Sequence, residues 1–224
     1  MHQRISRKIF IYLSLFFIFT TINNDFLNKL SLPKINFIKI NGLDAEEKKN
    51  LLIDLDYLKF ENLFFLDQNK IIEIIKSNKM IDKFSIYKNY PSTLEVEIKK
   101  TQFLASTKKE GVLYYVGSNG KLIRGKKTVL DLPFIFGNFK NQEFIEFKKI
   151  IDSSNFNFKD VKKLYFYPSK RWDIETLDGS IIKLPKYNLN NTLNFYVDLT
   201  KNENFQNFKS IDLRQKNQVI VNEK

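Results

Sequence analysis

The feature of this 224-residue chain that most constrains its fold is a short alternating run at residues 94–99. Leu94, Val96 and Ile98 alternate with charged residues, which is the period-two pattern of a strand with one buried face. Pro91 precedes the run and favours an extended backbone before it. A single half-buried strand is not stable alone, so the pattern predicts a sheet.

The preceding residues supply the other elements of a compact domain. Two further strands are predicted at residues 37–40 and 80–87, because both are rich in apolar residues and the first ends at an Asn-Gly turn. Helical patterns begin at Asp44 and at Asp67, which are typical N-cap residues. The predicted order is therefore strand, helix, helix, strand, strand, within the size of a small independent domain.

The N-terminal residues predict a membrane segment. Residues 9–24 carry no charge and are mostly Ile, Leu and Phe, and basic residues precede them. The basic flank predicts a cytoplasmic tail at residues 1–8, so we expect the remaining chain to be exported. The length of the apolar run alone favours a cleaved signal peptide. Because no small-residue cleavage pattern follows it, we expect a retained transmembrane anchor at residues 9–24.

Composition excludes several kinds of chemistry. The chain has no Cys, and its single His, His2, falls in the predicted cytoplasmic tail. His- or Cys-based catalysis and the usual zinc sites are therefore excluded from the exported part. The formal net charge of +12 comes mostly from Lys spread along the chain, which is typical of a solvated surface rather than a nucleic-acid site. We predict no enzyme activity, no cofactor, no metal and no nucleic-acid partner.

Residues 104–224 predict a second domain of mixed strands and helices. Apolar runs on both sides of the Gly117-Ser118-Asn119-Gly120 turn predict a hairpin. Helices are expected at residues 141–153 and 189–199. Further strands are expected at residues 161–167, 172–177, 181–184, 210–214 and 218–221.

Six landmarks follow one another along the chain. They are Ile38-Lys39-Ile40-Asn41-Gly42, Asn62-Leu63-Phe64-Phe65-Leu66-Asp67, Tyr90-Pro91-Ser92-Thr93-Leu94-Glu95-Val96, residues 115–123, Leu132-Pro133-Phe134-Ile135-Phe136-Gly137 and Ile211-Asp212-Leu213-Arg214. With the basic tail and the element order, they resemble the FtsQ/DivIB family of bacterial cell division proteins, and the first exported domain resembles a POTRA module. The resemblance implies an α+β fold: a single N-terminal transmembrane helix, a β-α-α-β-β POTRA domain at residues 35–103 and a C-terminal β-rich domain with a mixed sheet and helices.

The resemblance also implies a function. It implies a scaffold without catalytic activity, held in the cell inner membrane by one span with its N-terminus cytoplasmic and its bulk periplasmic, at the division septum. The implied partners are other divisome components, notably small single-span coiled-coil proteins of the FtsB and FtsL type.

The last predicted strand, residues 218–221, is the expected binding surface. No later segment covers it, so we expect an unpaired edge that accepts a partner strand through main-chain hydrogen bonds. An edge strand blunted by neighbouring lysines is the alternative. Trp and Arg are common interface anchors, although a Trp is as readily placed in a core. The predicted partner-binding residues are Arg171, Trp172, Leu213, Arg214, Gln215, Lys216, Gln218, Val219, Ile220 and Val221.

A second surface and three other functions are also predicted from the chain. Lys83, Tyr87 and Lys88, on or beside the second predicted strand, are the expected recruitment surface of the first domain. One alternative function is that of an exported POTRA-containing protein serving outer-membrane assembly or secretion. A periplasmic enzyme that uses carboxylates alone and a secreted lipid- or polysaccharide-binding domain are the others.

Overall fold

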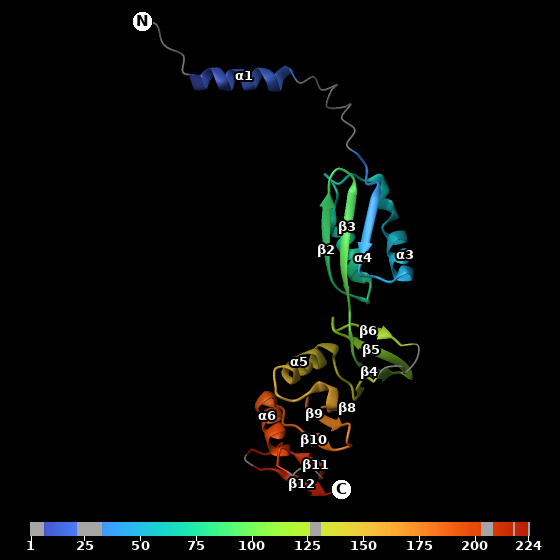
Figure 1. Ribbon diagram of the computed structural model, residues 1–224, viewed down its shortest axis with the longest axis vertical. Helices are drawn as coiled ribbons and strands as arrows, with labels where there is room; N and C mark the ends of the chain where they lie inside the picture. The colour runs from blue at the N-terminus through green and yellow to red at the C-terminus, as the bar shows by residue number, and fades with distance from the viewer. Residues whose placement is uncertain (1–6, 22–32, 126–130, 203–207, 217, 224) are drawn as a thin grey trace.

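The computed structural model describes residues 7–21, 33–125, 131–202, 208–216 and 218–223 (Figure 1). Its first element is the 15-residue helix α1 (Arg7–Thr21). In these described ranges no helix combines the length and the apolar character that crossing a membrane requires. Residues 22–24 of the predicted anchor lie outside the described residues.

The first domain has the predicted order of elements. Within residues 33–100, three strands form a sheet of order β1-β3-β2, in which β1 runs parallel and β2 antiparallel to β3. The elements are β1 (Phe37–Asn41), α3 (Ala45–Asp54), η1 (Asp56–Phe60), α4 (Gln68–Ser77), β2 (Ile81–Asn89) and β3 (Thr93–Lys100). The short 3-10 helix η1 was not predicted. The second strand runs from residue 81 to residue 89 rather than from 80 to 87.

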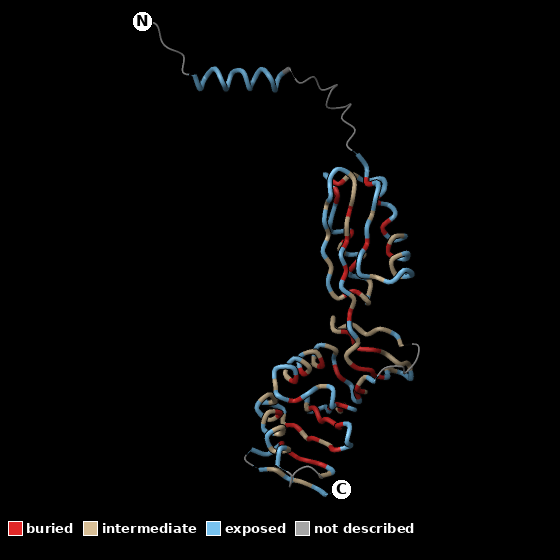
Figure 2. Tube along the Cα trace, in the orientation of Figure 1, coloured by how far each residue is buried: buried red, intermediate tan, exposed pale blue. Residues whose placement is uncertain are grey.

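The alternating run of β3 forms the centre of the first core. Leu94, Val96 and Ile98 are buried against Ile71 and Ile75 of α4, as the periodicity predicted. Figure 2 shows buried positions interspersed with exposed ones along the trace of this domain. Deleting buried aliphatic groups at such positions costs about 2–5 kcal/mol, which is why the spacing of this strand is a strong constraint.

Among the described residues, a second sheet has nine strands in the order β12-β11-β10-β9-β8-β7-β4-β5-β6. The strands are β4 (Phe103–Lys109), β5 (Val112–Gly117), β6 (Leu122–Arg124), β7 (Phe134–Phe136), β8 (Val161–Phe166), β9 (Trp172–Thr176), β10 (Ile181–Lys183), β11 (Phe208–Asp212) and β12 (Ile220–Glu223). The predicted hairpin is β5–β6, whereas β4 and β7 were not predicted. The helical segments are α5 (Asn141–Asp152), η2 (Phe158–Asp160) and α6 (Leu189–Thr200).

Helices α5 and α6 cover one face of this sheet and form the second core with it (Figure 1). Phe144 and Phe147 of α5 are fully buried against strand residues such as Ile174. Trp172 belongs to this core: it is 4% exposed, and its ring stacks on that of Phe147 with centroids 4.8 Å apart. The prediction of Trp172 as a surface anchor is therefore wrong, because the side chain points to the helix-covered face.

The two sheets meet where β3 leads into β4. The Asn119 side-chain amide, in the β5–β6 turn, donates hydrogen bonds to the main-chain oxygens of Lys79 and Ile81, both at 2.9 Å. Thr101 Oγ1 and Ser118 Oγ are 3.1 Å apart at the same junction. These contacts attach the β5–β6 hairpin of the second sheet to the start of β2. The opposite edge of the second sheet, formed by β12, takes no part in this junction.

Candidate functional site

The described part of the chain places β12 at an edge of the nine-stranded sheet. β12 pairs antiparallel with β11, with Ile211 opposite Val221 and Asp212 opposite Ile220. In the described residues no strand pairs with the other side of β12. The main-chain groups on that side are the type of template that accepts an added strand. The other edge strand of this sheet, β6, has only three residues.

The strand begins two residues later than predicted. β12 runs from Ile220 to Glu223, so Gln218 and Val219 precede it rather than form it. The side chains alternate between two faces here, because Val219 and Val221 pack against the core whereas Ile220 is 51% exposed. Packing of Val219 fixes the approach to the strand and leaves the Ile220 side chain available to a partner.

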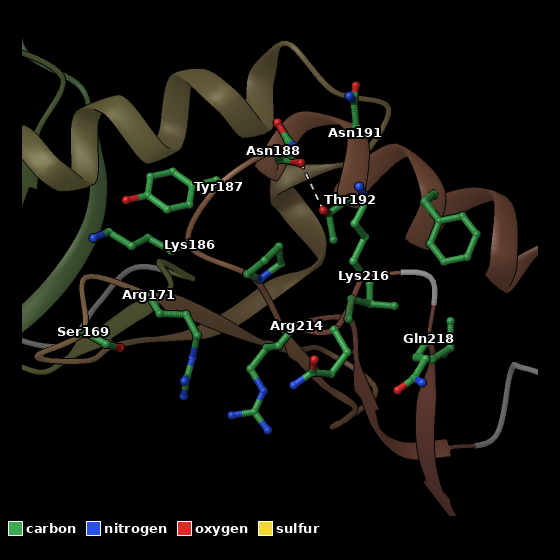
Figure 3. A pocket seen from close by; sticks show the side chains of 15 residues that line it. Ser169, Arg171, Lys186, Tyr187, Asn188, Asn191, Thr192, Arg214, Lys216 and Gln218 are labelled. Atoms are coloured by element: carbon green, nitrogen blue, oxygen red, sulfur yellow. Dashed lines mark hydrogen bonds between the residues drawn. The ribbon is translucent and has the colours of Figure 1, made fainter.

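A pocket of about 870 Å³ lies beside the start of β12 (Figure 3). It is bounded by the segment before α6, by α6 itself and by the segment between β11 and β12. Four of its described lining residues are basic, namely Arg171, Lys186, Arg214 and Lys216, and none carries a carboxylate. Two exposed aromatic rings, Tyr187 and Phe195, also line it. The pocket therefore suits an acidic group flanked by apolar surface.

Buried carboxylates position the two arginines of this pocket. Arg171 Nε donates to Asp173 Oδ1 at 3.1 Å, and Arg214 Nε donates to Asp212 Oδ1 at 2.8 Å. The Arg171 guanidinium also lies 4.4 Å from the centre of the Tyr167 ring. In Figure 3 the Arg171 and Arg214 side chains extend in the same direction from the sheet. Such fixed guanidinium groups lose little freedom when they bind an anion.

Protonation of Asp212 is expected to remove part of the stability of the site. The side-chain hydrogen bond from Arg214 holds the pKa of Asp212 below its ordinary value of 3.8. Because the folded pKa is depressed, this stabilisation is complete above the unfolded pKa and is lost as pH falls through the folded pKa. The free energy of unfolding of an Asp212→Asn variant should therefore fall below that of the parent chain at neutral pH and converge with it in acid. Urea unfolding at a series of pH values measures this difference, and a difference independent of pH would contradict it.

The structure brings together nine of the ten predicted partner-binding residues. Arg171, Leu213, Arg214, Gln215, Lys216, Gln218 and Val219 line the pocket, and Ile220 and Val221 lie on the adjoining strand. Trp172 is in the core, as described above. Sequence reasoning missed the lining residues Lys186, Tyr187, Asn188 and Phe195. Tyr187 is 71% exposed after a proline-containing turn, but nothing in the sequence places that turn beside β12.

The predicted surface of the first domain lies on β2. Lys83 and Tyr87 are exposed and Lys88 is half-buried on this strand, which pairs only with β3 in the described residues. These residues are far along the chain from the pocket and belong to the other sheet. The described residues contain no cluster of His, Cys, Asp and Glu that could hold a metal ion.

Comparison with known proteins first defines the class of the two domains. The POTRA domain model, FtsQ-type, matches residues 34–100, and the model of cell division protein FtsQ/DivIB, C-terminal, matches residues 105–214. The first domain is thus a POTRA module, and the second domain is of the type found at the C-terminus of FtsQ/DivIB division proteins. The chain belongs to the FtsQ/DivIB family of cell division proteins, which confirms the resemblance.

Three curated relatives illustrate the similarity. Cell division protein FtsQ of Bradyrhizobium diazoefficiens is 22% identical over 84% of this chain and 56% of its own length. FtsQ of Rickettsia bellii is 24% identical over 84% of this chain and 72% of its own length. Cell division protein DivIB of Staphylococcus aureus is 25% identical over 66% of this chain and 35% of its own length. The matched region thus spans little more than half of the first of these relatives.

Proposed function

We propose that this chain is a non-catalytic, single-pass scaffold of the bacterial cell division machinery. Residues 1–8 lie in the cytoplasm, residues 9–24 anchor the chain in the inner membrane, and two periplasmic domains follow at residues 35–103 and 104–224. The uncharged run behind a basic flank supports this orientation. The family of cell division proteins to which the chain belongs supports a place at the septum.

The scaffold binds a division partner by strand addition at β12. A partner segment pairs with the open side of residues 220–223, and main-chain hydrogen bonds supply affinity. The partner is a single-span coiled-coil protein of the FtsB or FtsL type, and other divisome components join the same assembly. Residues of the pocket select this partner, because four basic side chains line it and, in the described part of the chain, only two of them, Arg171 and Arg214, are paired with the buried Asp173 and Asp212. The remaining positive charge favours an acidic side chain next to the added strand.

One observation carries this proposal. The open edge of β12 and the basic pocket adjoin each other, since Gln218 and Val219 line the pocket and lead directly into the strand. An edge blunted against association would instead present charges and prolines along its length. Of the residues of β12, only Glu223 is charged, and the first two, Ile220 and Val221, are apolar.

Photo-crosslinking in living cells of the source bacterium tests the proposal. A photoreactive residue at Ile220 is expected to capture a small single-span division protein, identified by mass spectrometry. The matched control is the same residue at Leu177, which is 63% exposed in the same domain and follows β9, three strands from β12 in the sheet. Equal capture at both positions, or capture of no division protein at Ile220, would contradict strand addition.

A second contact surface in the POTRA module recruits the chain to the division site. It consists of Lys83, Tyr87 and Lys88 on the edge strand β2, and the support is the 47% exposure of the Tyr87 side chain beside two lysines. The same photoreactive residue at Tyr87 is expected to capture a divisome component. Absence of any division protein among its products would remove this surface from the proposal.

A further inference from the structure

Five aromatic side chains lie exposed at one end of the POTRA module. Phe37, Phe60, Phe64, Phe65 and Tyr90 are between 53% and 78% exposed, and we call them the aromatic end. None belongs to the core of this domain, and none lies in the surfaces proposed above. Clusters of exposed apolar side chains of this kind mark contact sites on folded proteins.

The main chain gathers these rings in one place. Phe37 begins β1 opposite Thr93 at the start of β3, and Tyr90 lies in the turn that joins β2 to β3. The Tyr90 and Phe64 rings are 4.8 Å apart between centroids. Ile35 N donates to Glu61 O at 2.9 Å, which brings the segment after η1 to the same end. Figure 1 shows that this end of the sheet is opposite the end that adjoins β4 and β5.

A local turn holds two of the rings outward. Asn62 Oδ1 accepts hydrogen bonds from the main-chain N–H groups of Phe64 and Phe65, at 3.0 and 3.1 Å. The leucines on either side, Leu63 and Leu66, are buried. The buried leucines and the Asx-type turn therefore fix the main chain of this segment. Little conformational entropy of the main chain is then lost when Phe64 and Phe65 bind another surface.

The aromatic end is also where the chain enters the POTRA module. Pro33 is nine residues beyond the end of the proposed anchor at residue 24, and a fully extended chain spans at most about 3.5 Å per residue, or roughly 30 Å. The anchor thus keeps this end close to the bilayer. Because β1 starts here and β3 ends at the opposite end, the second domain is attached on the other side of the module.

We propose that the aromatic end inserts into the interface of the bilayer that holds the anchor. This inference rests on the membrane anchor of the proposed function. Tyr and Trp concentrate at membrane–water interfaces. Amphipathic surface segments bury apolar side chains, Phe among them, about 5–10 Å into the headgroup boundary. Insertion at this end orients the POTRA module relative to the membrane and points the second domain, with β12, away from it.

The charges around the rings favour apolar insertion rather than attraction to anionic lipid. Lys34 Nζ lies 5.9 Å from the centre of the Phe60 ring, but Glu61 is exposed next to it. Lys59 forms an ion pair with Asp56. Because positive and negative groups are balanced here, binding to the interface should depend little on salt or on the fraction of anionic lipid.

A fluorescent label tests this insertion directly. The chain has no Cys, so Phe65→Cys provides a single site for an environment-sensitive nitrobenzoxadiazole label on the full chain in phosphatidylcholine vesicles. We expect a blue-shifted emission that lipids carrying nitroxide groups quench, in low and in high salt. The matched control is Leu177→Cys, which is 63% exposed in the second domain and should show neither effect. Replacing Phe60 and Phe64 by Ser in the labelled chain should reduce the quenching at residue 65.

A third label separates this inference from the anchor. Leu15→Cys, in α1, reports whether the apolar segment is within the bilayer. An unquenched label at residue 65 overturns the insertion, whatever the label at residue 15 shows. An unquenched label at residue 15 together with a quenched label at residue 65 contradicts the anchor and leaves the insertion standing. Quenching at residue 65 that requires anionic lipid and disappears in high salt would also overturn apolar insertion.

Discussion

Replacing Ile220 or Val221 by Pro is expected to abolish capture of a partner at β12. Successive residues of a strand direct their N–H groups to opposite sides, so one of the two substitutions removes a donor from the open side and the other removes one that faces β11. The proline ring also obstructs an incoming strand. Loss of one such hydrogen bond, about 1–1.5 kcal/mol, already weakens association about tenfold. The yield of partner captured by a photoreactive residue at Gln218, which these substitutions leave in place, measures the loss.

A side-chain substitution at the same position provides the control. Ile220→Thr keeps the backbone N–H and a β-branched side chain, so capture should persist. Thermal unfolding distinguishes the two proline variants, because only the one that interrupts pairing with β11 should unfold at a clearly lower temperature. Proline variants that capture the partner as well as the parent chain would show that main-chain pairing at β12 does not carry the association.

Trp172→Ala is expected to destabilise the second domain by about 3–5 kcal/mol, which is the usual cost of removing a buried aromatic side chain. Trp172 contacts four phenylalanine rings, those of residues 139, 144, 147 and 166. Its removal leaves a cavity between α5 and the sheet that these rings fill only in part. Urea unfolding followed by circular dichroism measures the change in the free energy of unfolding.

The more conservative Trp172→Phe variant should retain most of this stability and all of the partner capture. Since Trp172 is the only tryptophan of the chain, its emission in the parent should be that of a buried indole. A Trp172→Ala variant with unchanged stability but no partner capture would contradict its place in the core and restore it as a surface anchor.

The POTRA module could be predicted because its signals are local. The predicted alternation is confirmed, because Leu94, Val96 and Ile98 form the buried face of β3. The N-cap prediction at Asp67 is confirmed by the hydrogen bond that its Oδ1 accepts from Asn69 N at 3.0 Å. The predicted N-cap at Asp44 is also observed, and Asp44 N donates to Glu47 Oε2 in a capping box. Strand spacing and helix caps are properties of adjacent residues, so a single sequence contains them.

The parts that were missed depend on residues distant in sequence. β7 has three residues and is a strand only because β4 and β8 lie on its two sides, both parallel to it. Trp172 had a local signal, because Trp172 and Ile174 alternate with Asp173 and Glu175 along β9, although every residue of this strand is buried. Asp173 and Glu175 cover the other face of that strand, where Arg171 and Lys163 pair with them. The alternation thus puts Trp172 on the face of Ile174, but only the fold shows that α5 covers that face and that the polar face is buried as well.

The candidate site was predicted only in part, because some of its residues lie close together in the sequence and others do not. Arg214 and the last strand follow from the end of the sequence, where the motif Ile211-Asp212-Leu213-Arg214 and an apolar run stand close together. Tyr187 and Phe195 come from the connection to α6 and from the helix itself. Only the folded sheet brings that helix beside β12, so these two rings could not be assigned to the pocket from the sequence.

Hydrogen exchange of the β12 main chain is the most direct test of strand addition. With the exported part of the captured partner bound, the N–H groups of residues 220–223 on the open side should become protected, whereas those facing β11 are protected already. Added protection at these open-side amides is the result we predict. Protection confined to the pocket residues around Tyr187 and Arg214, with the β12 amides unchanged, would contradict partner binding through the edge strand.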